Sequence, residues 1–167
     1  MSQPRILLVD DSQSILKALR RTFAVENFNV TCASSAAEAL AVLAKNDIDI
    51  VISDENMPGV SGTVLLQQAR ELFPNVIRMM LTGATDIEVA KNAINQGAIW
   101  RFFTKPWDDF ELLTSVKQAL RVRDLEREND RLKVSLRQQS ELLRDLEEEY
   151  PGIAEKRTSS DGAIIID

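Results

Sequence analysis

Histidine is absent from this chain of 167 residues, and its absence narrows the chemistry that the protein can perform. Without histidine there is no Ser-His-Asp or Cys-His catalytic group, no imidazole metal ligand and no imidazole general base. Any chemistry must therefore use carboxylates, lysine, serine or threonine. A metal ion bound by such oxygen ligands is expected to be a hard ion.

The chain also has a single cysteine, no long apolar run and no excess of positive charge. Cys32 is the only cysteine, which excludes an intrachain disulfide and a cysteine-based zinc site. It lies in a strand-like segment, where we expect a reduced core thiol. No long apolar run follows Met1, so we expect a cytoplasmic protein without a membrane span. The net charge of −6 argues against non-specific binding to nucleic acid or acidic membranes.

What the chain does contain is a regular alternation of two patterns. Its 44% hydrophobic and 28% charged residues are typical of a soluble globular protein, and its length suffices for one domain with an appendage. Strand-like and helix-like segments alternate five times, which predicts an α/β fold with a parallel sheet covered by helices on both faces. The expected strands are 5–9, 29–33, 48–53, 76–81 and 99–103; the expected helices are 12–25, one from 35, 61–72, 86–96 and one from 108.

The third expected strand ends at an acidic residue. Apolar residues run from Ile48 to Ile52, and the strand stops at Asp54, before a loop that contains Pro58 and Gly59. A carboxylate at the C-terminal end of a buried strand lies where open α/β sheets bind their ligands. Considered alone, Asp54 could instead form an Asx turn or a helix cap.

Other polar residues end the neighbouring strands. Because the C-terminal ends of parallel strands share one edge of a sheet, Asp54 is expected near Asp10, Asp11, Thr82 and Lys105. Three close carboxylates stay ionised only when a cation shares the site, and oxygen ligands favour Mg²⁺. With a lysine and a hydroxyl nearby, this set has the parts for phosphoryl transfer onto an aspartate.

The set Asp10-Asp11, Asp54, Thr82 and Lys105-Pro106 resembles that of the receiver domain of two-component response regulators, over roughly residues 4–122. The resemblance implies a flavodoxin-like fold with five parallel strands in the order 2-1-3-4-5. It also implies a signalling protein rather than an enzyme, with a histidine kinase or phosphotransfer protein as phosphoryl donor and a downstream effector protein as target.

The same resemblance implies roles for the acidic residues. Asp54 would be the phosphoacceptor. Asp11, Asp54 and the backbone carbonyl of Asn56 would bind Mg²⁺ directly, with Asp10 acting largely through water.

It also implies roles for residues on the last two strands. Lys105 would hold a phosphoryl oxygen, and its bond to Pro106 would be cis. Thr82 would move toward the phosphate, and Phe102 would rotate inward behind it, although simple packing is the alternative for Phe102. Ala84 has no polar group to orient an attacking water, so fast self-dephosphorylation is not implied. The aromatic residues of this region predict either a partner-docking patch or ordinary burial: Trp100, Phe102, Phe103 and Trp107.

The last helix is predicted to continue far beyond a receiver domain, because no Pro or Gly occurs in residues 122–149. A heptad register fits it, which predicts a receiver at 1–122 and a coiled-coil helix at 123–150. Asn129 at one a position favours a parallel homodimer. The alternative is a lone solvated amphipathic helix. The a positions are Val122, Asn129, Leu136, Leu143 and Tyr150, and the d positions are Leu125, Leu132, Gln139 and Leu146.

Pro151 and Gly152 end the long helix, and the residues after them are mostly polar with a short apolar finish. Residues 151–167 would be a flexible tail, a strand that docks elsewhere or the start of something longer, with a possible turn at Asp161-Gly162.

A haloacid-dehalogenase-type phosphatase would need Asp-x-Asp, whereas Asp10 and Asp11 are adjacent. In a flavodoxin-like electron carrier, those two carboxylates would repel the flavin phosphate. The acidic set argues against a constitutive dimer scaffold. The sequence shows no helix-turn-helix or basic patch for DNA.

Overall fold

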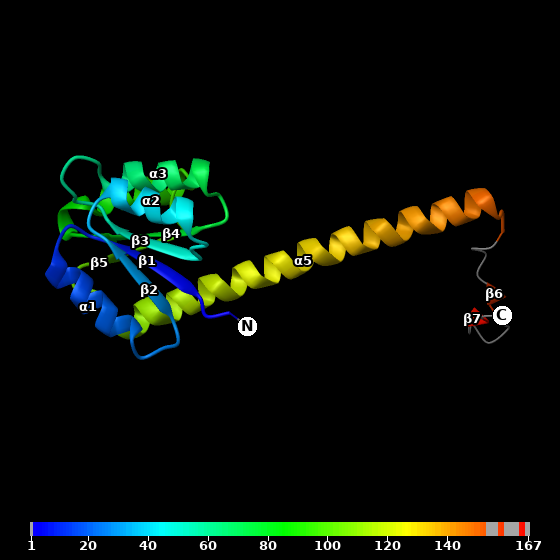
Figure 1. The fold of residues 1–167 in the computed structure, drawn as a ribbon, viewed down its shortest axis with the longest axis horizontal. Coiled ribbons are helices and arrows are strands. Elements are labelled where there is room, and N and C mark those ends of the chain that lie inside the picture. Colours follow the sequence, from blue (N-terminus) through cyan, green and yellow to red (C-terminus); the bar gives the residue numbers. More distant parts are fainter. Residues whose placement is uncertain (1, 153–156, 159–163, 166–167) are drawn as a thin grey trace. The chain divides into compact units, whose positions relative to one another are not determined.

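The computed structural model describes residues 2–152, 157–158 and 164–165. The chain divides into two compact units, Met1–Leu120 and Arg121–Asp167. In the first unit, a five-stranded parallel sheet has the order β2-β1-β3-β4-β5 (Figure 1). The predicted flavodoxin-like fold is therefore confirmed.

The strands lie close to their predicted positions. They are β1 Arg5–Val9, β2 Asn29–Ala33, β3 Ile50–Asp54, β4 Ile77–Thr82 and β5 Arg101–Thr104. The last strand begins two residues later than expected, because the chain is still completing the turn after the preceding helix. Gly97 has a φ of 73°, and the N–H of Ala98 donates to the Ala93 carbonyl. This left-handed glycine and its backbone bonds are typical of a helix C-terminus.

Five helices alternate with the strands, and all but the fourth begin at a side-chain cap. They are α1 Gln13–Phe23, α2 Ala36–Lys45, α3 Gly62–Leu72, α4 Ile87–Asn95 and α5 Asp109–Glu149. Ser12, Ser35 and Ser61 each accept a hydrogen bond from the backbone N–H three residues later. Asp108 does the same for Glu111, which confirms the predicted start of α5. Two helices differ from prediction: α1 ends at Phe23, and a 3₁₀ turn, η1 Ala84–Asp86, precedes α4.

Two apolar cores lie on the two faces of the sheet. Buried residues of α2, α3 and α4 pack on one face, and those of α1 and the first turns of α5 pack on the other (Figure 1). All five residues of β3 are buried. Because β3 is central and both faces are covered, its C-terminal carboxylate is held rigidly at the sheet edge.

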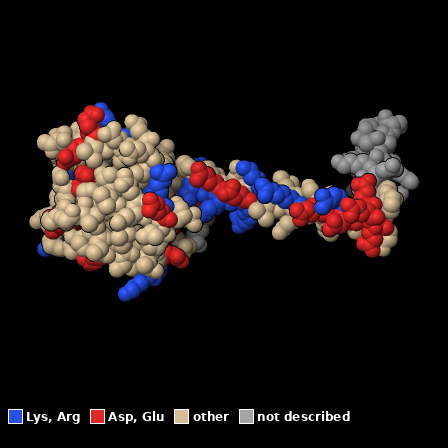
Figure 2. Space-filling model, turned by 90° about the horizontal axis from the view of Figure 1, so that it is seen from above, with Lys and Arg blue, Asp and Glu red and all other residues tan. Residues whose placement is uncertain are grey.

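The second unit contains the rest of α5 and a two-stranded antiparallel sheet, β6 Arg157–Thr158 and β7 Ile164–Ile165. Apolar heptad residues are exposed on the single helix, with Leu125 at 61% and Leu136 at 63%. Basic and acidic side chains are mixed along this helix (Figure 2). The predicted turn at Asp161-Gly162 lies outside the described residues. Among the helices described here, none combines the length and apolar character needed to cross a membrane.

Candidate functional site

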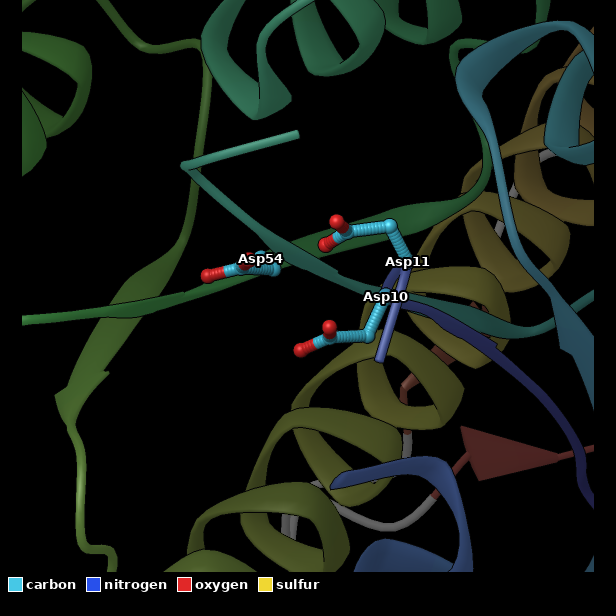
Figure 3. A group of neighbouring side chains, drawn as sticks. All are labelled: Asp10, Asp11 and Asp54. Atoms are coloured by element: carbon cyan, nitrogen blue, oxygen red, sulfur yellow. The ribbon is translucent and has the colours of Figure 1, made fainter. Parts of the chain in front are cut away.

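The C-terminal ends of β1 and β3 bring three carboxylates together. Asp10 and Asp11 follow β1, and Asp54 ends β3; one oxygen of each lies within 4.8 Å of the others. Their side chains extend in the same direction from the edge of the sheet (Figure 3). Asp10 and Asp54 are buried, at 1% and 5% exposed, whereas Asp11 is exposed. The parallel register explains this meeting, since Val9 pairs with Ser53 one residue before each carboxylate.

Lys105 completes the cluster from the loop after β5. Its Nζ lies 3.0 Å from Asp10 Oδ2 and 2.9 Å from Asp54 Oδ1. The backbone N–H of Lys105 donates to the Thr82 carbonyl at 2.8 Å, so the residue is tied to β4 where it leaves the sheet. Its bond to Pro106 is cis, as predicted. The ammonium therefore joins two strand ends that are far apart in the sequence.

The pKa values of two members of the cluster are shifted in the same direction. Burial raises the pKa of the Asp54 carboxyl, and the Asp10 charge adds to this; the bond from Lys105 opposes it. Burial acts to lower the pKa of Lys105, but its bonds to Asp54 and Asp10 outweigh that effect and raise it. Both shifts mean that the folded site holds protons tightly. A site with more carboxylates than cations attracts positive charge.

The donor set fits a hard divalent cation. Two buried carboxylates and one exposed carboxylate lie close enough to share an ion, and the cluster contains oxygen donors and no sulfur or imidazole. Mg²⁺ prefers such ligands and keeps some of its waters, which an exposed position such as Asp11 permits. A bound Mg²⁺ would offset the negative charge of these carboxylates.

The other predicted site residues lie at or near the same edge. Thr82 is the last residue of β4 and is fully buried. Its hydroxyl donates a hydrogen bond to the Gly83 carbonyl at 3.3 Å. Phe102 of β5 pairs with Met80 of β4, and its side chain is partly buried against the core that contains α2, α3 and α4. Asn56 lies in the loop after Asp54, and its side-chain amide donates to Asp86.

Two residues that support Asp54 were not predicted from the sequence. Glu55 is only 8% exposed, and its carboxylate accepts hydrogen bonds from the Thr63 N–H at 2.9 Å and hydroxyl at 2.7 Å. A Cβ on Gly62 would lie 2.2 Å from the Asp54 carbonyl oxygen. The start of α3 therefore packs directly on the backbone of the candidate phosphoacceptor. Glu55 adjoins Asp54 in sequence and could have been suspected, but no pattern marks Gly62.

Known proteins resemble the whole first unit. A family model described as "Response regulator receiver domain" matches residues 6–117. The hydrogenase transcriptional regulatory protein HoxA of Cupriavidus necator is 35% identical over 85% of this chain, and the C4-dicarboxylate transport transcriptional regulatory protein DctD of Rhizobium meliloti is 36% identical over 84%. The signal receiver domain of an HD domain-containing protein from Pseudomonas fluorescens Pf-5 shares 38% identity, covers 77% of this chain and 94% of that one, and superposes with a TM-score of 0.72.

The match covers only part of the curated relatives. This chain spans 29% of HoxA and 30% of DctD. The transcriptional role in the names of those proteins therefore belongs to chains of which the present one matches less than a third.

Proposed function

The chain belongs to the response regulator receiver family, whose members are signalling modules of two-component systems, and from that premise we propose that Asp54 accepts a phosphoryl group. The donor is a histidine kinase or a phosphotransfer protein. The single observation that supports this proposal best is the position of Lys105, whose Nζ lies 2.9 Å from Asp54 Oδ1. An ammonium at that distance can bind an oxygen of a phosphoryl group attached to Asp54.

The transfer needs little covalent chemistry from the protein. A carboxylate oxygen of Asp54 attacks phosphorus; the new O–P bond forms as the bond from phosphorus to the donor nitrogen breaks, and that nitrogen keeps the electron pair. Lys105 stabilises the negative charge on the phosphoryl oxygens, and the Thr82 hydroxyl donates a further hydrogen bond after turning away from Gly83.

The acidic residues serve the same step. Asp10, Asp11, Asp54 and the backbone carbonyl of Asn56 would hold Mg²⁺, directly or through water. When bound, the ion neutralises charge on the carboxylates and on the incoming phosphoryl group. The grouping of three carboxylates, with one oxygen of each within 4.8 Å of the others, supports this assignment.

A conformational change of Thr82 and Phe102 transmits phosphorylation of Asp54 to the β4–β5 region. Movement of Thr82 toward the phosphoryl group opens space behind it, and Phe102, which is only partly buried, turns into that space. The packing change alters the surface near α4, β5 and the start of α5, where an effector protein binds.

The long part of α5 forms a parallel coiled-coil dimer. Its exposed apolar residues recur in one heptad register, and charged residues pair across the dimer, Arg121 with Glu126 and Glu128 with Lys133. The output is a change in dimer contacts or helix geometry, delivered in the cytoplasm. Residues 1–122 are the receiver and 123–150 are the dimerisation helix.

A titration with beryllofluoride, a phosphoryl mimic, tests the central proposal. With Mg²⁺ present, beryllofluoride should change tryptophan fluorescence of the wild type, and Asp54→Asn should abolish the change. Asp47→Asn makes the same chemical change at an exposed position near the opposite end of β3 and should respond like the wild type. A wild-type signal that stays flat, or a response that survives in Asp54→Asn, would contradict the proposal.

A further inference from the structure

A hydrogen-bonded cluster links α1 to the loop that carries Lys105. We propose that Thr22, Trp107 and Asp109 are positioning residues that fix the loop carrying Lys105, so that its ammonium lies where a phosphoryl oxygen binds. This inference rests on the proposed function, since Lys105 must contact the phosphoryl group.

The three side chains meet at one point. The indole N–H of Trp107 lies 3.2 Å from Thr22 Oγ1 and 3.0 Å from Asp109 Oδ1. The Thr22 hydroxyl lies 2.7 Å from the same Asp109 oxygen. Thr22 is buried in α1, and Asp109 is the first residue of α5. One carboxylate oxygen therefore links α1, the loop after β5 and the start of α5.

The hydrogen-bonding capacities of these groups fit the geometry. Trp107 can only donate, and Asp109 when ionised can only accept. The Thr22 hydroxyl has one proton; its distance to Asp109 is 2.7 Å, shorter than the 3.2 Å to the Ala18 carbonyl in its own helix. Its proton is therefore directed to Asp109, and its oxygen remains free to accept from Trp107. A hydrogen bond to a charged group is stronger than one between neutral groups.

The loop needs such an anchor because the sheet holds only one side of Lys105. The backbone N–H of Lys105 is bonded to β4, but the chain then leaves the sheet through Pro106, and Trp107 lies two residues on. The ring of Trp107 is only partly buried against the core that contains α1 and α5.

Open space borders the loop on two sides. A groove of about 420 Å³ lies toward α1, and another of about 510 Å³ lies toward α4 and β5. Pro106 and Trp107 line both grooves. Packing alone therefore leaves this segment room to shift, and the hydrogen bonds to Thr22 and Asp109 select one position for it.

A comparison of metal binding with phosphoryl-mimic binding separates positioning from general stability. Mg²⁺ is bound by the carboxylates and is repelled by the Lys105 ammonium beside them, whereas the same ammonium strengthens beryllofluoride binding. In Thr22→Val, which removes the hydroxyl and keeps the shape, calorimetry should show Mg²⁺ binding no weaker than in the wild type. At saturating Mg²⁺, the beryllofluoride Kd should be about fivefold weaker, the effect expected for one lost hydrogen bond. Thr22→Ser, which restores a hydroxyl, should recover most of the wild-type affinity.

Two further variants sharpen the test. Trp107→Phe keeps an aromatic ring and removes the N–H, so it should reproduce the selective loss even if Thr22→Val folds poorly. In a Lys105→Ala background, Thr22→Val should have no additional effect on beryllofluoride binding, because the residue that the network positions is gone.

The outcomes distinguish this inference from the function on which it rests. An equal loss of Mg²⁺ and beryllofluoride affinity in both variants, or wild-type beryllofluoride affinity in both, would overturn the positioning role alone. A wild-type protein that binds Mg²⁺ but no beryllofluoride would overturn the proposed function first, and the inference with it.

Discussion

Asp54 illustrates, at the scale of single residues, how burial sets the response of the site to pH. Its pKa in the folded protein lies above the ordinary 3.8, so the folded state holds the proton more tightly than the unfolded chain. Without metal, the contribution of Asp54 to stability is therefore lost as the pH rises from 3.8 through the raised pKa. In chelator, Asp54→Asn should be more stable than the wild type at neutral pH, and urea denaturation should show the difference shrinking toward about pH 4. A difference that stays constant with pH would show that the titration of Asp54 is not its cause.

A second prediction at this scale concerns the substitution Gly62→Ala. In most helices Gly→Ala stabilises by up to about 1 kcal/mol. Here the added Cβ would lie 2.2 Å from the Asp54 carbonyl oxygen, so backbone atoms must move. We expect Gly62→Ala to lower the free energy of unfolding by about 2–3 kcal/mol and to weaken Mg²⁺ binding.

Gly83 provides the matched control for that measurement. A Cβ there would meet no atom within 4 Å, and its φ is −79°. Gly83→Ala should leave the free energy of unfolding within about 0.5 kcal/mol of the wild type. Equal effects of the two substitutions would refute the packing argument.

At the scale of elements, serine caps define where α1, α2 and α3 begin. Ser35 Oγ accepts from the Glu38 N–H at 3.1 Å, and the Glu38 carboxylate accepts from the backbone and hydroxyl of Ser34. Ser35→Ala should lower the free energy of unfolding by about 1 kcal/mol, measured by chemical denaturation. Ser14→Ala, at an exposed position within α1, should have no such cost, because alanine is the better helix former there.

At the scale of the whole molecule, the proposed dimer depends on the apolar positions of one heptad register. Leu132→Glu places a charge at a d position and should reduce the mass measured by light scattering from dimer to monomer. Val134→Glu makes a similar change two residues away, at an f position, and should leave the mass unchanged. A monomeric wild type, or equal effects of both substitutions, would favour the lone amphipathic helix.

The layered fold and most residues of the site follow from the order of apolar and polar segments along the chain. Alternating apolar segments specify strands and helices, parallel strands align their C-terminal ends, and the residues there are therefore neighbours. For this reason the order of strands and their polar ends suffices to place Asp10, Asp54 and Lys105 together. The element boundaries were less well determined, as β5 shows, because the turn after α4 extends past Gly97 through backbone bonds that leave no mark in the apolar pattern.

The groups that support the site are brought to it by packing between segments that are distant in the sequence. The contact of Gly62 with the Asp54 backbone and the meeting of Thr22 with Trp107 and Asp109 join segments separated by 8 to 87 residues. No periodicity or local motif encodes such pairs. They arise from the packing of α1, α3 and the loop after β5 against the sheet, which fixes distances that neither composition nor spacing can specify.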